Sequence, residues 1–208
     1  MDNQWMSATM LGPDGRARCR WCGTAPEFLP YHDQEWGFPV ADDRRLFEKL
    51  SLEGFQSGLS WRTILAKREN FRAAFHHFDF ERVARFTSRD VERLLKDAGI
   101  VRHRGKIEAV VNNARRAGEL IKRNGSLAAF IWRYEPDPRG HVKRQAAATS
   151  AESIALSKDL KKLGWRFVGP TTVYAFMQAM GLINDHAEDC VIRTKVERAR
   201  MRFKRPAR

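Results

Sequence analysis

The sequence lacks the features that a membrane or secreted protein needs. No apolar run approaches the roughly 18 residues that cross a bilayer. The segment from Met1 to Leu11 has neither the basic start nor the apolar stretch of a signal peptide. The chain has only 3 cysteines, too few and of odd number for a disulfide framework. We therefore expect a cytoplasmic protein, because the cytoplasm keeps thiols reduced.

Internal repeats are absent, and no segment alternates apolar and polar residues cleanly enough to predict a β-strand. Apolar residues instead recur at helical spacing. Asp42 and Ser60 are suitable N-caps before two such stretches, and Thr87 with Asp90 forms a capping box before a third. The stretch 135–149, rich in Pro, Gly and charge, is the clearest predicted loop. With 208 residues, 43% of them hydrophobic, the chain fits one all-α domain of about eight or nine helices.

Negative charge is scarce relative to positive charge. The 38 Lys and Arg residues exceed the 25 Asp and Glu residues, which gives a net charge of +13 and points to a polyanionic partner. The excess is greatest in residues 191–208, where eight Lys and Arg residues stand against one Glu. We treat this segment as a basic C-terminal tail. It is either a solvated, frayed end or an arm that binds phosphates without reading sequence.

The segment 158–173 has the features of a helix-hairpin-helix, a module that grips the DNA backbone without reading its sequence. Gly164 favours the end of one helix, because the residue there needs a positive φ. Gly169 and Pro170 favour the start of the next helix, whose free N–H groups can bind a phosphate. The candidate DNA contacts in this segment are Lys162, Gly164, Gly169, Thr171 and Thr172. The alternative is an ordinary turn between two helices, which carries the same Gly and Pro signals.

Four possible metal ligands lie near the two ends of the chain. His186 and Cys190 are four residues apart, on one face if the segment is helical. Cys19 and His32 would complete a Cys₂His₂ set, which suits a closed tetrahedral zinc site that ties the two ends together. In the alternative reading, His186 and Cys190 are a buried pair without metal. Cys22, in a C-x-x-C with Cys19, could also compete as a ligand.

Aromatic and acidic residues are concentrated in two short segments, 31–37 and 52–61. Glu53 in the second segment follows an apolar helix face. A carboxylate among Trp and Tyr rings can bind a flat, electron-poor ring by stacking and hydrogen bonds. The alternative is that Glu53 is a solvated residue at a helix end and that Trp61 belongs to the core.

Several long segments occur together in the order that is typical of one family. They are RCRWC, YHDQEWG, LFEKLSLEGFQSGLSW, KRENFRAAFHHFD, DAGIVRHRGKIEAVVNNAR, LSKDLKKLGWRFVGPTTVYAFMQAMGLINDH and the closing Cys190. On these residues the chain resembles DNA-3-methyladenine glycosylase I, an alkylation-repair family of bacteria, over residues 18–190. The resemblance implies the helix-hairpin-helix glycosylase fold and hydrolytic release of 3-methyladenine from double-stranded DNA. It also implies one structural zinc ion, held by Cys19, His32, His186 and Cys190.

The resemblance further implies which residues bind the damaged base. The base pocket would consist of Trp21, Tyr31, Glu53 and Trp61, with Glu53 as the candidate catalytic residue. Gln56, Gly58 and Leu59 match the loop that enters the gap left by the flipped nucleotide. The resemblance implies no obligate protein partner, and we expect the protein to act as a monomer.

The chain departs from the family pattern at a few positions. Phe28 stands where the family often has Tyr, so one polar contact at the pocket rim is missing. Cys22 and the basic tail 191–208 are not part of the pattern. Residues 1–17 have no counterpart in the shortest members, and we expect them to be a poorly ordered extension.

Two other functions fit some of these features. One is a bifunctional glycosylase/lyase that uses Lys161 or Lys162 as a Schiff-base amine. The other is a zinc-stapled DNA-binding module without catalysis, which would be favoured by loss of Glu53 or of a pocket Trp. Glu53 and both pocket tryptophans, Trp21 and Trp61, are present in this chain.

Overall fold

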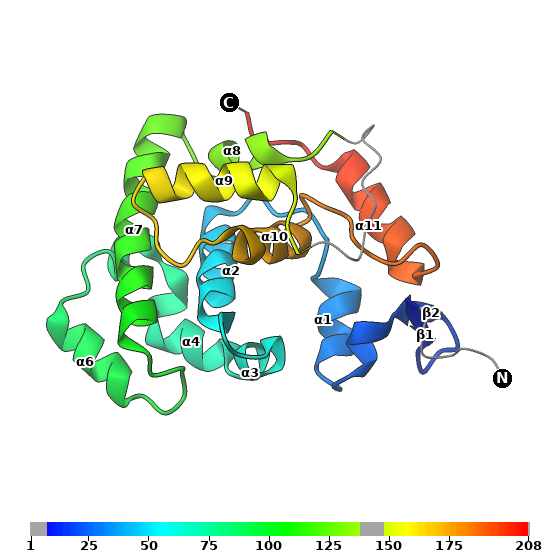
Figure 1. The fold of residues 1–208 in the computed structure, drawn as a ribbon, viewed down its shortest axis with the longest axis horizontal. Coiled ribbons are helices and arrows are strands. Elements are labelled where there is room, and N and C mark those ends of the chain that lie inside the picture. Colours follow the sequence, from blue (N-terminus) through cyan, green and yellow to red (C-terminus); the bar gives the residue numbers. More distant parts are fainter. Residues whose placement is uncertain (1–7, 138–147, 208) are drawn as a thin grey trace.

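The computed structural model describes residues 8–137 and 148–207. Most of the predicted loop 135–149, and residues 1–7 of the expected extension, lie outside these ranges. The described residues are mostly helical, which confirms the predicted fold class (Figure 1). No helix among them is both long and apolar enough to cross a membrane.

The helices follow one another as α1 (Phe28–Gln34), α2 (Asp43–Gln56), α3 (Trp61–Ala66), α4 (Arg68–Ala74), α5 (Phe80–Val83), α6 (Ser88–Lys96), α7 (Arg104–Asn124), α8 (Leu127–Ile131), α9 (Ala151–Lys162), α10 (Pro170–Ala179) and α11 (Val191–Arg202). Short 3-10 helices are η2 (Arg20–Gly23), η3 (His76–Phe78) and η4 (Trp132–Tyr134). The predicted caps are confirmed. Asp42 accepts a hydrogen bond from the Arg45 N–H at 2.8 Å, and Ser60 caps α3. Thr87 and Asp90 form the capping box of α6.

Helix α2 lies in the middle of the molecule and packs against α3, α7, α8 and α10 (Figure 1). Its apolar residues Leu46, Phe47 and Leu50 are at most 2% exposed, so α2 supplies much of the core. The same helix also buries Lys49 and Glu53. Charged side chains therefore enter the interior on a helix that apolar packing fixes.

Helices α9 and α10 pack against each other and are joined by residues 163–169, as the helix-hairpin-helix pattern predicts. Gly164 has the positive φ of +80° that this turn requires. Two asparagines of α7 support the turn. The Asn113 side chain both donates to the Arg166 carbonyl and accepts from the Arg166 N–H, each at 2.9 Å, and Asn112 donates to the Gly164 carbonyl at 2.8 Å. The hairpin is thus held by the helix behind it.

The chain before α1 contains a short β-hairpin that the sequence did not predict. Strand β1 (Thr9–Leu11) pairs antiparallel with β2 (Ala17–Cys19). Arg18 fixes this hairpin, because its guanidinium group forms ion pairs with Asp14 at 2.5 Å and Asp33 at 2.9 Å. Strands of three residues are too short to show the alternation that signals a strand. The described part of the expected poorly ordered extension is therefore a paired hairpin.

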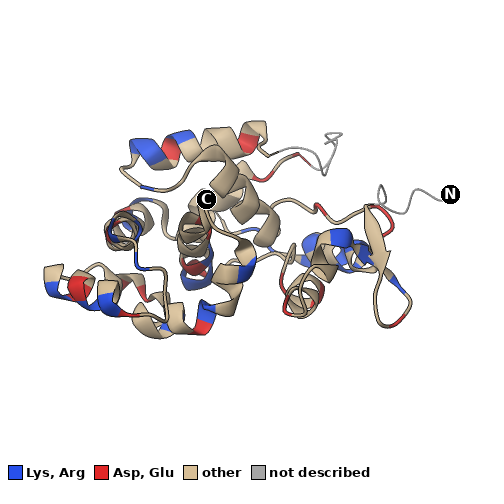
Figure 2. Ribbon diagram, turned by 60° about the horizontal axis from the view of Figure 1, so that its bottom comes forward, with Lys and Arg blue, Asp and Glu red and all other residues tan. Residues whose placement is uncertain are grey.

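The basic C-terminal segment forms the packed helix α11 and is not a frayed end. Ile192 and Val196 are fully buried. Arg200 is 8% exposed and forms an ion pair with Glu135 at 2.9 Å. The remaining basic residues that the structure describes here are partly or fully exposed; Figure 2 shows Lys and Arg on α11 and at the end of α9 that leads into the hairpin. Part of the charge excess therefore stabilises the fold.

The C-terminus of α10 lies so close to the segment after α1 that a side chain at position 181 would collide with that segment. Gly181 has a φ of +78°, and a Cβ there would lie 2.5 Å from backbone atoms of Phe38 and Pro39. We expect Gly181→Ala to destabilise the protein by about 1–3 kcal/mol from backbone strain alone. Gly118→Ala in α7 is the matched control, since its Cβ meets nothing within 4 Å, and it should be neutral or stabilising by up to about 1 kcal/mol. Urea denaturation measures both; equal midpoints for the two variants would contradict this account.

Candidate active site

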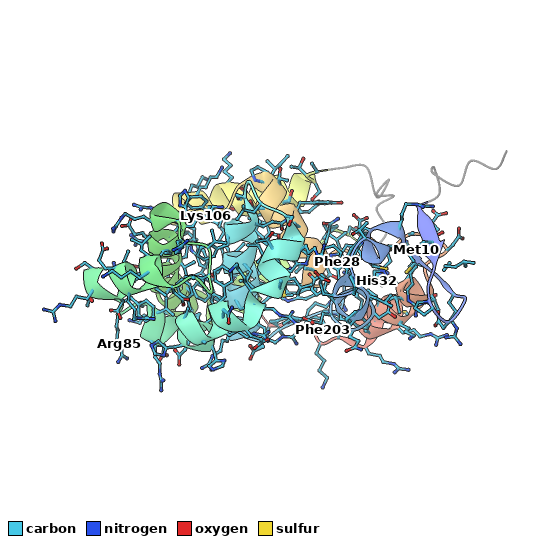
Figure 3. All side chains as sticks on the ribbon, turned by 90° about the horizontal axis from the view of Figure 1, so that it is seen from below. Met10, Phe28, His32, Arg85, Lys106 and Phe203 are labelled. Atoms are coloured by element: carbon cyan, nitrogen blue, oxygen red, sulfur yellow. The ribbon has the colours of Figure 1, made fainter. Side chains whose placement is uncertain are left out.

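Four buried side chains from the two ends of the chain meet at one point. They are Cys19, His32, His186 and Cys190, and their ligand atoms all lie within 4.8 Å of one another. The Cys190 Sγ is 3.5 Å from both the His32 Nε2 and the His186 Nδ1. The Cys19 Sγ is 3.6 Å from the same Nδ1 atom. Figure 3 shows His32 near Phe28, at the end of the molecule that α11 occupies. Such separations fit one tetrahedral ion, because bonds of about 2.0–2.3 Å leave ligand atoms roughly 3.5 Å apart.

Outer hydrogen bonds orient both histidines toward this cluster. With its Nε2 facing the thiols, His32 donates its Nδ1–H to Asp33 at 2.7 Å. His186 faces the cluster with Nδ1 and donates its Nε2–H to the Trp36 carbonyl at 3.0 Å. Partners of this kind fix the tautomer and ring orientation of a metal-binding histidine. The Cys₂His₂ group can therefore hold a metal ion.

The electrostatics of the cluster favour a cation. The hydrogen bond to Cys190, together with burial, raises the pKa of the Cys19 thiol. The hydrogen bond from Cys19 lowers the pKa of Cys190 despite its burial, and both histidines lower it further. Burial lowers the pKa of His32, but hydrogen bonds to Cys190 and Cys22 outweigh this effect and raise it to about 10. Protons on Cys19 and His32 thus balance the negative charge of the Cys190 thiolate. A bound metal ion would displace these protons.

A cavity of about 350 Å³ opens beside the cluster. Its lining residues are Ala8, Cys19, Arg20, Trp21, Tyr31, Trp36, Glu53, Gln56, Trp61, Ala175, Gln178 and Asp185. All four residues that we expected to bind the base, Trp21, Tyr31, Glu53 and Trp61, are among them. They come from η2, α1, α2 and α3, so the cavity lies where the N-terminal segments meet the central helix.

Aromatic rings form one wall of this cavity. The centroid of the Tyr31 ring lies 6.3 Å from that of Trp21 and 5.5 Å from that of Trp61. The Phe28 ring is 5.8 Å from Trp21 but does not line the cavity. Rings with one carboxylate beside them suit a flat, electron-poor ligand, which can stack and donate a hydrogen bond at the same time.

Lys49, which lies behind the aromatic wall of this cavity, was not predicted from the sequence. The Lys49 Nζ forms an ion pair with Glu53 at 2.8 Å, donates to the Tyr31 hydroxyl at 2.7 Å and lies 3.4 Å from the centroid of a Trp61 ring. Burial lowers the pKa of Lys49, with Glu53 opposing the effect; burial, and then the charge of Glu53, raises the pKa of Tyr31. The signal that could have found it is a Lys and a Glu four residues apart within an apolar helical stretch.

Asp185 is a second carboxylate in the cavity lining. Its Oδ2 accepts hydrogen bonds from the Tyr174 hydroxyl at 3.1 Å and from the Gln178 amide at 2.6 Å. The residue is 5% exposed, and its Oδ1 has no hydrogen-bond partner among the described residues. Asp185 therefore keeps one free acceptor next to the cavity.

The loop expected to enter the DNA follows directly from α2. Gln56 lines the cavity, Gly58 has a φ of +77°, and Leu59 is 42% exposed. Lys106 of α7 supports the loop, because its buried ammonium group donates to the Phe55 carbonyl at 2.9 Å. The apolar Leu59 is thus presented to solvent on a backbone that is held from behind.

The predicted backbone contacts lie on the hairpin. Lys162, Gly164 and Thr171 are exposed, and Gly169 and Thr172 are partly exposed. The hairpin also presents Phe167, which is 39% exposed. A Cβ on Gly54 would lie 3.4 Å from Phe167, so the hairpin touches α2 two residues before Gln56. Loop and hairpin therefore lie on the same side of the molecule.

The family model described as methyladenine glycosylase matches residues 21–194. The chain is 47% identical over 177 residues to DNA-3-methyladenine glycosylase 1 of Escherichia coli (strain K12), covering 83% of this chain and 95% of that protein. It is 45% identical over 181 residues to DNA-3-methyladenine glycosylase of Haemophilus influenzae, covering 85% and 98%. This chain belongs to the methyladenine glycosylase family.

Solved structures of the family agree in fold. A crystal structure of 3-methyladenine DNA glycosylase I superimposes with a TM-score of 0.77 at 48% identity, covering 84% of this chain and 98% of that one. The enzyme from Staphylococcus aureus, whose structure concerns its recognition of 3-methyladenine, superimposes with a TM-score of 0.77 at 40% identity, covering 82% and 93%. The family match ends at residue 194, so most of α11 lies beyond the matched residues.

The metal cluster makes a prediction for stability. We expect the purified protein to contain one metal ion per chain. The Cys190→Ala variant should lose this ion, because only three protein ligands would remain to coordinate it. A loss of about 3 kcal/mol would lower the Tm by roughly 6–12 °C in a domain of this size. Cys22→Ala is the control, since Cys22 is equally buried but is not one of the four ligands. Elemental analysis and thermal melts measure both effects; metal retained in Cys190→Ala or lost in Cys22→Ala would contradict this ligand set.

Proposed function

We propose that this protein is a monofunctional DNA glycosylase that flips 3-methyladenine out of alkylated double-stranded DNA and hydrolyses its N-glycosylic bond. The activity follows from membership of the methyladenine glycosylase family, whose members it matches over nearly their full length. The observation that carries the assignment of the site is that Trp21, Tyr31, Glu53 and Trp61 line one cavity.

The residues of the cavity suit a cationic base. Methylation at N3 puts positive charge on the adenine, which makes it a good leaving group, so little acid catalysis is needed. Trp21 and Trp61 stack on the cationic ring, a contact worth about 0.5–2 kcal/mol. Glu53 accepts a hydrogen bond from the exocyclic amine and disfavours a base that presents an acceptor there. Tyr31 bonds an edge nitrogen.

The DNA is held through its backbone while the nucleotide is flipped. Lys162, Gly164, Gly169, Thr171 and Thr172 bind phosphates at the hairpin and at the N-terminus of α10. Gln56, Gly58 and Leu59 fill the gap in the base stack. Flipping costs a few kcal/mol, and less for a damaged base; filling the gap offsets part of this cost. Water then attacks the anomeric carbon, and the free Oδ1 of Asp185 makes this residue the second carboxylate to test.

Zinc is the ion that the metal centre would bind, with Cys19, His32, His186 and Cys190 as its ligands. Two thiolates and two imidazoles suit zinc, and four protein ligands complete its tetrahedron. No coordination position is left for water, so the ion stabilises the fold and takes no part in the reaction. We further propose that the protein acts as a monomer in the cytoplasm, where bacterial DNA lies.

The two alternatives are less well supported. A lyase needs an amine at the sugar, and Lys161 and Lys162 are exposed on α9 and are not among the residues that line the cavity. Borohydride should therefore trap no covalent adduct with abasic DNA. A non-catalytic DNA-binding module would have no use for Glu53 buried beside aromatic rings.

Glu53→Gln tests the assignment. The amide is nearly isosteric but loses the charge and half of the acceptor capacity. Losing a charge-assisted hydrogen bond in a dry pocket costs about 1.5–3 kcal/mol, so excision of 3-methyladenine should slow by roughly 10- to 150-fold. DNA affinity should not change, whereas free 3-methyladenine should bind more weakly.

Glu48→Gln is the matched control for this variant. Glu48 lies on the same helix but forms its ion pair with Arg72, at 2.7 Å, and does not line the cavity. It should excise at the wild-type rate. Normal excision and normal base binding by Glu53→Gln would refute the role of Glu53, and Asp185→Asn would then be the next variant to measure.

A further inference from the structure

Three of the four proposed base-binding residues meet on a single buried ammonium group. Lys49 lies one helical turn before Glu53, and its side chain is 7% exposed. Its Nζ is 2.8 Å from the Glu53 Oε1 and 2.7 Å from the Tyr31 hydroxyl. It also lies 3.4 Å from the centroid of a Trp61 ring. One cation therefore contacts a carboxylate, a phenol and an indole at once.

Lys49 lies behind the wall of the base pocket. It is absent from the residues that line the 350 Å³ cavity. It instead lines a small adjoining cavity of about 30 Å³, together with Tyr31 and Trp61. A flipped base therefore meets Glu53, Tyr31 and Trp61 but does not meet Lys49, so any effect of Lys49 acts through these residues.

We propose that Lys49 is a positioning residue of the base pocket, which keeps Glu53 ionised, engages one of its carboxylate oxygens and fixes the Trp61 ring. This inference rests on the proposed function, because it assigns the role of Lys49 through the base-binding role of Glu53. With Oε1 engaged by Lys49, the other oxygen of Glu53 is the acceptor for the exocyclic amine.

Three other cations near the pocket have partners of their own. Arg20, which lines the same cavity as Glu53, donates to the Thr9 carbonyl at 3.0 Å. Arg68 of α4 pairs with Glu35, which follows α1, at 2.6 Å. Arg72 pairs with Glu48 at 2.7 Å. Lys49 is the ion-pair partner of Glu53 among the described residues. For a carboxylate that is 5% exposed, the charged form has a large desolvation cost unless a counter-charge lies beside it.

Other acidic and polar groups that face the pair do not replace Lys49. Asp185, from the loop after α10, lines the same cavity as Glu53 and adds negative charge. Tyr31 accepts from Lys49 and has a pKa well above its ordinary value because of burial, so it remains neutral. Removing the ammonium group would leave the Glu53 carboxylate without its counter-charge, in a cavity that also holds Asp185.

Trp61 supports the same conclusion. Its indole N–H is buried and has no hydrogen-bond partner among the described residues. The contact with the Lys49 ammonium is thus the polar interaction that fixes the ring. A cation against an indole face contributes up to about 2 kcal/mol when both are desolvated.

The decisive experiment is a pH profile of base release from methylated DNA. Lys49→Met keeps an unbranched side chain of similar length and removes the charge. We expect its excision rate to fall further below wild type as the pH is lowered and to recover toward wild type by pH 8.5. The acidic arm of the profile, where the rate falls as the pH is lowered, should move to higher pH by at least one unit. One unit corresponds to a tenfold change in proton concentration. Lys49→Arg keeps the charge and should leave that arm in place.

Arg72→Met is the matched control, because it removes the cation from Glu48 on the same helix. It should lower stability without moving the pH profile, and thermal melts separate the two effects. If Lys49→Met does not fold, Lys49→Gln carries the same expectation. A profile of Lys49→Met or Lys49→Gln that superimposes on wild type, or that is lowered equally at every pH, would overturn the inference.

Glu53→Gln in the same assay distinguishes a failure of the role of Lys49 from a failure of the proposed function. If Glu53→Gln is impaired while Lys49→Met keeps the wild-type profile, only the role of Lys49 is refuted. If Glu53→Gln excises normally, the proposed base pocket is itself refuted, whatever Lys49→Met does.

Discussion

The convergence of Cys19 and His32 with His186 and Cys190 is the constraint on which the site depends. These residues come from opposite ends of the chain, yet their ligand atoms lie within 4.8 Å of one another. Three of the four ligands lie within two positions of a residue that lines the cavity. Trp21 follows Cys19 by two positions, Tyr31 directly precedes His32, and Asp185 directly precedes His186. The cluster therefore places one wall of the cavity that we propose as the base pocket, and its Cys19 is itself part of that wall.

The opposite wall depends on α2. That helix is fixed by apolar residues on its core side, and it carries Lys49 and Glu53 one turn apart into a dry environment. A buried ion pair contributes little net stability, because the desolvation cost of the two charges is nearly as large as their attraction. What it supplies here is geometry: it orients a carboxylate and an indole toward the cavity. In the proposed site this pair serves the pocket and not the stability of the helix.

Much of this could be predicted from the sequence, because local rules decide it. The caps at Asp42 and Ser60 and the positive φ at Gly164 follow from short-range chemistry. The four metal ligands were proposed from their residue types and from the spacing of His186 and Cys190, and the family resemblance supported the same set. The candidate base-pocket residues came from the resemblance, since nothing local links segments so far apart in the chain. Three features escaped. The β-hairpin has strands too short for periodicity, Lys49 looks like an ordinary surface lysine in the sequence, and the packing of α11 depends on partners far away in the chain.

The charge of the chain shows why composition alone overstates DNA binding. Arg200 is buried against Glu135, as Arg18 is against Asp14 and Asp33, so these cations hold the fold together. The candidate phosphate contacts lie instead on the hairpin, where Lys162 and exposed backbone N–H groups can approach DNA without desolvating a core. The base cavity is lined by aromatic rings and two carboxylates, and its described lining includes Arg20 but no lysine. In the proposed function a cationic base meets rings and negative charge, while the described lining includes no primary amine that could attack the sugar, which is the combination that hydrolysis without strand cleavage requires.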